Sequence, residues 1–174
     1  MTEQEFRQTY AAMAGGDPEA LSALYAALAP CVYAIALSVA GQPADAEDVV
    51  SEVFLRLWQR RNPYTFRGKN RSWISTVAYH AAVDRLRRGG REAWEGEELL
   101  EALPCPPEEE RLCDRLTLAQ ALAALPEAQR QVVALHVISD LPLRETARLL
   151  GRPLGTVASQ HRDAMKRLRN ILTG

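Results

Sequence analysis

The segment that decides the fold runs from Leu143 to Val157 and reads LRETARLLGRPLGTV. Ala147 is small at the point where two helices must approach closely, and Gly151 supplies the positive φ of a tight turn. Leu154 and Val157 are expected to fill the wedge between the two helices. The pattern therefore predicts a helix-turn-helix, whose second helix directs its first exposed residues into the major groove of DNA. An ordinary helical hairpin with a basic C-terminus is the alternative.

The charges of the chain are divided into blocks. Residues 1–55 carry eight acids and one base, whereas residues 56–91 carry ten bases and one acid. Residues 92–114 carry nine acids and one base, residues 115–140 are balanced, and residues 141–174 carry seven bases and two acids. Phosphate binding depends on local charge, so two basic blocks separated by an acidic one indicate two anionic contacts, although solvated helix faces would give the same pattern.

Helical periodicity predicts an all-α protein, because no segment alternates as a half-buried strand does. We expect a small helical domain over residues 1–90, an acidic flexible linker over 91–114, and a second helical domain with the helix-turn-helix over 115–174. Asp17 and Ser72 are the predicted N-caps of the second and fourth helices. Glycine, proline and apolar spacing predict four helices in the first domain: one that ends near Gly15, one over Pro18–Val39, one that begins near Ala44 and one from Ser72 to Gly89. In the second domain they predict helices over Leu116–Leu125 and Pro126–Ile138, followed by a final pair after Leu141.

The composition is typical of a soluble globular protein, with 47% hydrophobic and 25% charged residues in a chain of 174. The most apolar window, Ala26–Gly41, contains Pro30 and is shorter than the roughly 18–20 apolar residues of a membrane span. Residues 1–5 are acidic, whereas a secretory signal begins with basic residues. These features predict a cytoplasmic protein without membrane insertion.

The three cysteines, Cys31, Cys105 and Cys113, include no C-x-x-C pair. Disulfides are rare in a reducing cytosol, so we expect three free thiols. A metal or redox pair between Cys105 and Cys113 is the alternative, but no histidine lies near enough in sequence to suggest a zinc finger. We therefore predict no metal and no cofactor.

A second set of motifs lies in the N-terminal half. Residues 45–58 read DAEDVVSEVFLRLW and, after Phe66 and Trp73, residues 78–88 read AYHAAVDRLRR. These motifs resemble region 2 of the extracytoplasmic-function (ECF) sigma factors, the smallest class of the sigma-70 family. The segment from Leu125 to Val157 resembles region 4 of the same family. Two motif sets in the right order, with an acidic linker between them, are more specific than either set alone.

The resemblance implies that residues 45–58 dock on a coiled coil of the largest subunits of core RNA polymerase. An acidic, partly apolar helix offers charge complementarity to a basic partner. Its apolar positions recur every three or four residues and are expected to be core: Val49, Val50, Val53, Phe54, Leu57 and Trp58. The exposed face supplies the predicted polymerase-binding residues Asp45, Asp48, Glu52, Leu55 and Arg56.

The resemblance assigns residues 59–72 to a loop that captures a flipped base of the single-stranded −10 element. Such a base needs polar groups for its edge and apolar or aromatic surface for stacking. The residues expected there are Asn62, Tyr64, Phe66, Lys69, Asn70, Arg71 and Trp73, of which Phe66 could equally be a packing residue. The following helix is expected to bring His80, Asp84, Arg85, Arg87 and Arg88 to the DNA. Asp84 could instead orient a neighbouring arginine.

The resemblance assigns the duplex −35 element to the helix-turn-helix. The predicted contacts are Arg144, Thr156, Ser159, Gln160, His161, Arg162, Lys166 and Arg167. The sequence departs from the family pattern in two places. His80 stands where the family commonly has Asn, and the usual Thr-Val-Lys-Ser-Arg of the recognition helix reads TVASQ over residues 156–160. The two missing cations predict either an unusual −35 element or a weak contact with it.

The resemblance implies an alternative sigma factor, which binds core RNA polymerase and directs promoter-specific initiation. It also implies an anti-sigma partner and a linker that either threads the polymerase channel or acts as a tether. A regulator that uses only the helix-turn-helix is a competing function, but it would not need a basic helix after an aromatic-rich loop. An enzyme is disfavoured because His80, His136 and His161 are scattered and no nucleophile lies beside a base.

Overall fold

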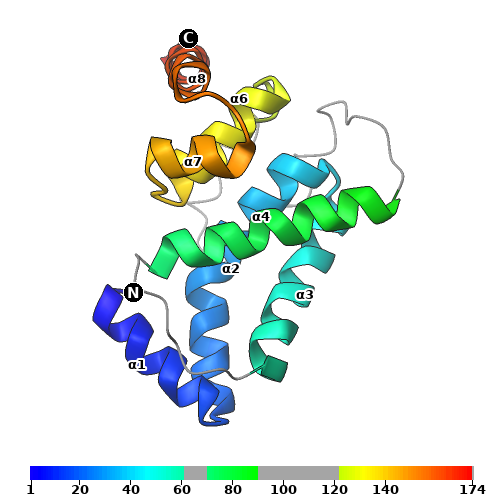
Figure 1. Ribbon diagram of the computed structural model, residues 1–174, viewed down its shortest axis with the longest axis vertical. Coiled ribbons are helices and arrows are strands. Elements are labelled where there is room, and N and C mark those ends of the chain that lie inside the picture. The colour runs from blue at the N-terminus through cyan, green and yellow to red at the C-terminus, as the bar shows by residue number, and fades with distance from the viewer. Residues whose placement is uncertain (61–69, 90–121, 174) are drawn as a thin grey trace.

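The computed structural model describes residues 1–60, 70–89 and 122–173, and its regular elements in these ranges are helices, as predicted. They are α1 (Glu3–Ala14), α2 (Pro18–Ala40), α3 (Pro43–Arg60), α4 (Asn70–Gly89), α6 (Glu127–Val132), the π-helical η2 (Val133–Ile138), α7 (Leu143–Leu150) and α8 (Leu154–Thr173). Helices α1–α4 form one bundle, and α6–α8 lie together at one end of it, with the C-terminus on the outside (Figure 1).

The observed caps agree with the sequence except at α4. The Asp17 carboxylate accepts the backbone N–H of Glu19 at 2.9 Å, which confirms Asp17 as the N-cap of α2. Gly41 ends α2 with a left-handed φ of 74°. The prediction for Ser72 is wrong, because α4 already begins at Asn70 and Ser72 is buried inside it.

The core of the N-terminal bundle surrounds α2, which packs against α1, α3 and α4. The predicted apolar stripe of α3 is buried here, with Val49 and Val53 fully enclosed and Trp58 half-buried at the edge. Ile74 of α4 and Met13 of α1 close the same core. This packing leaves the acidic side of α3 and the basic end of α4 at the surface.

By length and composition alone, α2 is long and apolar enough to cross a membrane, which the sequence analysis did not anticipate. Its apolar window is more than half buried by the neighbouring helices. The end of the helix, from Ile35 to Ala40, is buried throughout. A central helix enclosed on several sides needs apolar residues around most of its circumference, so the core position accounts for this composition.

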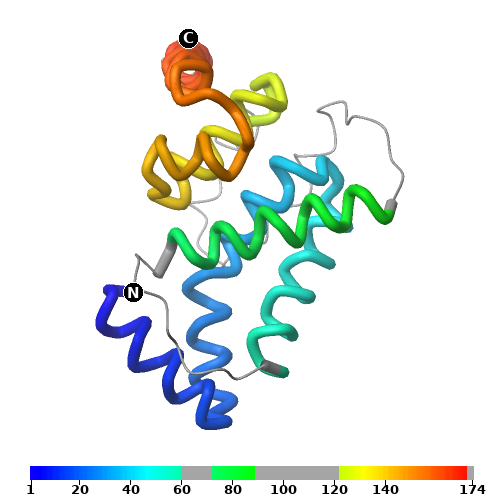
Figure 2. The backbone as a smooth tube through the Cα atoms, in the orientation of Figure 1, coloured from blue at the N-terminus to red at the C-terminus, as the bar shows by residue number. Residues whose placement is uncertain are grey.

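The two halves of the chain share an apolar core. Ala134, Leu135 and Leu141 of the C-terminal half belong to the same buried cluster as the core of α1–α4. The reduced thiol of Cys31 in α2 donates to Ser139 Oγ at 3.3 Å across this contact. Figure 2 shows α6–α8 seated against the end of the bundle. The linker predicted over 91–114, with Cys105 and Cys113, lies outside the described residues.

Candidate nucleic-acid interface

The turn between α7 and α8 has the geometry predicted for a helix-turn-helix. Gly151 caps α7 with a φ of 63°, the left-handed conformation that favours glycine. Its N–H donates to the carbonyl of Arg148 at 3.3 Å, and the N–H of Arg152 donates to that of Ala147 at 3.0 Å. These two bonds form a Schellman motif, which fixes the path of the chain into α8.

The wedge between the helices contains one of its two predicted residues, Val157, but not Leu154. Val157 and Ala147 are buried together with Val132 of α6, as expected for close helix packing. Leu154, in contrast, is 43% exposed, so its predicted place in the wedge is wrong. It is the first residue of α8, one turn before Val157, and Leu143 and Leu150 of α7 pack against the small cluster instead.

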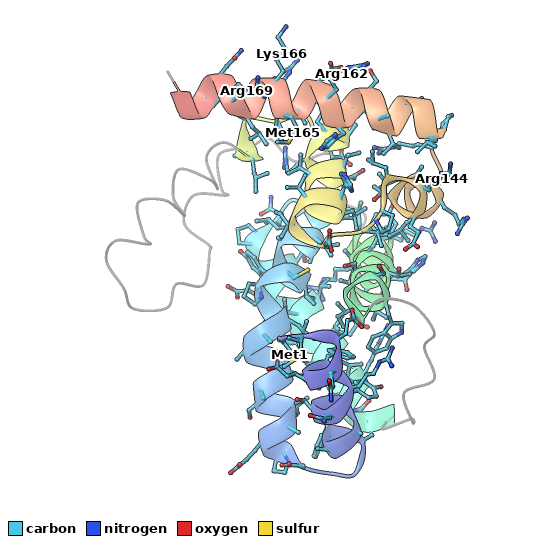
Figure 3. All side chains as sticks on the ribbon, turned by 90° about the vertical axis from the view of Figure 1, so that its left-hand side faces the viewer. Met1, Arg144, Arg162, Met165, Lys166 and Arg169 are labelled. Carbon is cyan, nitrogen blue, oxygen red and sulfur yellow. The ribbon has the colours of Figure 1, made fainter. Side chains whose placement is uncertain are left out.

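Helix α8 divides its side chains between an inner and an outer side. Val157, Ala164 and Leu168 recur at helical spacing and are buried. On the outer side, Arg162 and Lys166 are exposed and project away from the rest of the molecule (Figure 3). Further predicted −35 contacts are also exposed or half-buried: Arg144 at the start of α7, and Thr156, Ser159 and Arg167 on α8. This outer side is a helix-turn-helix surface able to meet a DNA backbone.

Gln160 lies at the edge of the buried stripe, where its side chain takes part in a hydrogen-bond network. Arg152 Nη1 donates to Gln160 Oε1 at 3.3 Å and to the carbonyl of Ala128 at 3.3 Å. Arg152 Nη2 donates to Gln131 Oε1 at 2.6 Å, and Gln131 Nε2 donates to Glu127 Oε1 at 2.7 Å. The network joins α6, the turn and α8, so the structure places Gln160 in contacts within the domain.

His161 flanks the other side of the buried stripe. Its ring meets that of His136 in η2 edge to face, with the ring centroids 4.9 Å apart. His136 Nδ1 lies 2.7 Å from the carbonyl of Leu141, and this bond requires the proton on Nδ1. Burial, and secondarily repulsion from His136, lowers the pKa of His161. His161 is thus half-buried in the domain and not on the outer side of α8.

In the N-terminal half, residues predicted to bind DNA pair with residues predicted to bind polymerase. Arg85 Nε on α4 donates to Asp45 Oδ1 on α3 at 3.0 Å, and its Nη2 pairs with Asp48. The hydrogen bond with Asp45 is the main cause that raises the pKa of Arg85. The two predicted surfaces therefore meet along the α3–α4 boundary.

A third acid, Glu52, extends this charged boundary. Glu52 on α3 pairs with Arg56 one turn later and lies 3.8 Å from Arg88 Nη2 on α4. Arg88 is 63% exposed, so this contact is loose and open to solvent. Leu55 on the same helix is 54% exposed beside these acids.

The remaining −10 candidates have different environments. His80, Asp84 and Arg87 are exposed on α4, and Arg85 pairs with the acids of α3 and not with Asp84. Trp73 packs edge to face on Tyr10 of α1 with ring centroids 5.7 Å apart, so much of its surface serves packing. The loop candidates Asn62, Tyr64, Phe66 and Lys69 lie outside the described residues, as do the side chains of Asn70 and Arg71.

Sequence reasoning did not identify Arg152 and Gln131 as parts of the interface. Gln131 is 5% exposed and is held between Glu127 and Arg152. One signal in the sequence could have pointed to the pair: an arginine directly after the capping Gly151, in a chain with Gln160 in place of the usual cation. Within the described ranges, no group of three or more His, Cys, Asp or Glu side chains is placed to hold a metal ion.

Comparison with known proteins identifies both halves of the chain. Residues 24–92 match the family model of sigma-70 region 2, and residues 115–168 match that of sigma-70 region 4. The chain is 30% identical over 162 residues to the ECF RNA polymerase sigma factor RpoE of Cereibacter sphaeroides, with coverage of 90% of this chain and 88% of the relative. It is 28% identical over 170 residues to the ECF RNA polymerase sigma factor SigK of Mycobacterium bovis, with coverage of 92% and 89%.

Two solved structures share the fold. The sigma factor RpoE from Bartonella quintana, in complex with the anti-sigma factor NepR, aligns with a TM-score of 0.62 at 22% identity, over 86% of this chain and 94% of that one. CnrH, in complex with the cytosolic domain of CnrY, aligns with a TM-score of 0.56 at 22% identity, over 97% of each chain.

Proposed function

The chain belongs to the ECF group of the sigma-70 family, and from this premise we propose that its two basic surfaces divide the promoter between them. As an alternative sigma factor it directs promoter-specific transcription initiation by RNA polymerase. The division of labour rests on one observation: exposed cations gather on α4 in one half and on the outer side of α8 in the other. We assign residues 1–90 to polymerase and −10 binding, 91–114 to the linker and 115–174 to −35 binding.

In the N-terminal domain, α4 is the proposed contact for the melted −10 strand. Arg85, Arg87 and Arg88 lie on its C-terminal half with His80 and Asp84, and arginines on one helix can hold successive phosphates. Asp45, Asp48, Glu52, Leu55 and Arg56 of α3 form the adjoining polymerase contact, since an acidic surface with an exposed leucine fits a basic and partly apolar partner. The loop residues Asn62, Tyr64, Phe66, Lys69, Asn70 and Arg71 are proposed to capture the flipped base.

In the C-terminal domain, α8 is proposed to enter the major groove at the −35 element. Thr156 and Ser159 lie near its N-terminal end, where a recognition helix meets base edges. Arg144, Arg162, Lys166 and Arg167 are exposed and suited to the flanking phosphates. Specific readout then depends on few polar side chains, so we expect this contact to contribute more to position than to sequence discrimination.

An anti-sigma factor is the proposed negative regulator. The structural neighbour RpoE was solved in complex with the anti-sigma factor NepR, and CnrH in complex with the cytosolic domain of CnrY; both align over most of this chain. A partner that blocks initiation has to cover the polymerase contact on α3 or the DNA contacts on α4 and α8. Sigma factors regulate transcription and are not catalysts, so we propose no enzymatic activity and a location in the cytoplasm, where polymerase and chromosome meet.

The direct test is to reconstitute holoenzyme from core polymerase and the full-length chain and to map transcript 5′ ends on genomic DNA. The proposal predicts initiation sites that share two sequence elements, one near −10 and one near −35. A protein that binds duplex DNA alone, forms no holoenzyme and supports no initiation would contradict it and would favour a regulator.

A further inference from the structure

Arg152 occupies a fixed place at the centre of the helix-turn-helix. Its backbone N–H closes the Schellman motif on Ala147, and Pro153 follows it directly, so its main chain has little freedom. From there the guanidinium reaches two other elements of the domain, α6 through Ala128 and Gln131, and α8 through Gln160. A planar group with five donors can make these bonds at the same time, which an ammonium group on a flexible stem cannot do in the same geometry.

The donors of Arg152 determine which end of the Gln160 amide faces it. Arginine can only donate, so the atom of Gln160 that it meets must be the carbonyl oxygen. The same reasoning orients Gln131, whose carbonyl faces Arg152 while its amide donates to Glu127. Each amide in the network thus has one possible orientation.

This orientation limits what Gln160 can read. A glutamine identifies adenine by a bidentate contact, in which its carbonyl accepts from N6 and its amide donates to N7. The carbonyl of Gln160 is held by Arg152, and its side chain is half-buried at the inner edge of α8. An arginine at position 160, as in the usual family pattern, would place a second cation against Arg152, so the departure at 160 and the arginine at 152 fit each other.

We propose that Arg152 is a positioning residue that holds Gln160 out of base readout and sets the orientation of α8, so that reading of the −35 element depends on Thr156 and Ser159. The inference rests on the proposed function, in which α8 is the −35 recognition helix. It assigns Gln160 a role inside the domain and makes the missing cation at position 160 a consequence of the Arg152 network.

The experiment uses holoenzyme and a pool of promoter duplexes that are randomised across the −35 region and keep the −10 region of a promoter mapped for the wild-type chain. Bound duplexes are sequenced for five chains: wild type, Gln160→Ala, Gln160→Glu, Arg152→Ala and the double variant Arg152→Ala/Gln160→Ala. Gln160→Glu is the matched control, because it keeps an acceptor for Arg152 and removes the amide donors. Thermal melting of each chain shows that it is folded.

We expect Gln160→Ala and Gln160→Glu to select the same bases as wild type. Arg152→Ala should lower affinity by about tenfold, as for the loss of a hydrogen bond to a charged group. It should also gain adenine selection at one −35 position, because the freed Gln160 carbonyl can then accept from adenine N6. This gain should vanish in the double variant, a result that a general loss of stability would not produce.

Two further measurements separate positioning from a phosphate contact. If Arg152 bound a phosphate, Arg152→Ala would reduce the salt dependence of binding by a slope of about 0.9, and Arg152→Lys would restore affinity. We expect neither change. Altered base selection in Gln160→Ala alone, or rescue by Arg152→Lys, would overturn the inference. A wild-type holoenzyme that selects no base in the −35 pool would instead contradict the proposed function on which the inference rests.

Discussion

The two basic surfaces of the molecule differ in what surrounds their cations. On α4, Arg85 pairs with Asp45 and Asp48 of the neighbouring helix, so this cation, which is predicted to meet DNA, already has acidic partners. On α8, Arg162 and Lys166 project from the outer side, and no ion pair of either is found among the described residues. The polar network of that domain lies on the inner side of α8.

This difference indicates two ways of binding an anion. At the α3–α4 boundary a phosphate has to replace a carboxylate that already accepts from arginine, whereas at α8 it replaces only water. The exposed pair with Asp48 contributes less than about 1 kcal/mol, so its exchange costs little, whereas the part-buried pair with Asp45 resists exchange more. This exchange links polymerase binding to DNA binding, because a polymerase that engages Asp45 and Asp48 would leave Arg85 available to DNA.

The largest effect is expected from removing the cations of α4. The triple variant Arg85→Ala/Arg87→Ala/Arg88→Ala should reduce promoter-dependent transcription by at least about 100-fold and lower the salt slope of binding by about 2, since each lost phosphate contact on a single strand contributes about 0.7. Run-off transcription and filter binding by the holoenzyme measure both. The triple variant Arg144→Ala/Arg162→Ala/Lys166→Ala is the matched set in the other half, and it should lose less activity. Equal losses would remove the distinction between the two surfaces.

The stability of the C-terminal surface should depend on the backbone conformation of the turn between α7 and α8. Gly151→Ala places a side chain at a φ of 63° and should lower the free energy of unfolding by about 1–2 kcal/mol. An added Cβ would meet no atom within 4 Å, so the loss would come from backbone strain and not from a clash. Gly155→Ala, where space is equally open, is the control and should change stability by less than about 1 kcal/mol. Urea denaturation monitored by circular dichroism checks both, and equal effects would contradict a special role of the turn.

Much of the fold could be predicted because local rules decide it. Asp17 before Pro18 set the start of α2, and Gly151 set the turn, since capping and positive φ depend on a few adjacent residues. Leu154 was misplaced because apolar spacing does not say whether the first residue of a helix faces its neighbour. Packing of Leu135 and Leu141 on the N-terminal core could not be foreseen either, because an apolar face does not specify what covers it.

The candidate sites show the same limit. The basic residues of α4 and α8 were correctly expected on helix surfaces. Asp45 and Arg85, however, were assigned to different functions, polymerase binding and DNA binding, although they form an ion pair in the fold. They are forty residues apart, and long-range ion pairs leave no local pattern. Gln160 was expected on the DNA because of its position in the motif, whereas its partner Arg152 is visible only when the turn and α6 are brought together.

A smaller effect should follow from releasing Arg85. Asp45→Asn removes the charge that accepts from Arg85 Nε and should increase the affinity of the isolated chain for a single-stranded −10 oligonucleotide by a few-fold, as expected for a part-buried pair near the surface. Its affinity for core polymerase should fall, because the acid is also a proposed docking residue. Fluorescence anisotropy with each ligand measures the two changes, and Glu3→Gln on α1 is the control. Unchanged oligonucleotide binding would show that the pair does not compete with DNA.

The smallest expected effect is a change in how stability depends on pH, and it is caused by His161 on the inner side of α8. Burial, and secondarily repulsion from His136, lowers the pKa of His161 below its ordinary value of 6.5. Above about pH 6.5 the ring is neutral in both the folded and the unfolded chain, so it contributes no pH dependence there. As the pH falls below 6.5, the unfolded chain takes up the proton first, and the free energy of unfolding should therefore decrease until the lower folded pKa is reached. Urea denaturation at pH 7.5 and pH 5.5 should show a smaller decrease for His161→Gln than for wild type, because carboxylates contribute equally to both. An identical decrease in both chains would mean that the His161 ring takes up its proton as readily in the folded as in the unfolded chain. The contrast between a closed inner side and an open outer side of α8 would then not extend to His161.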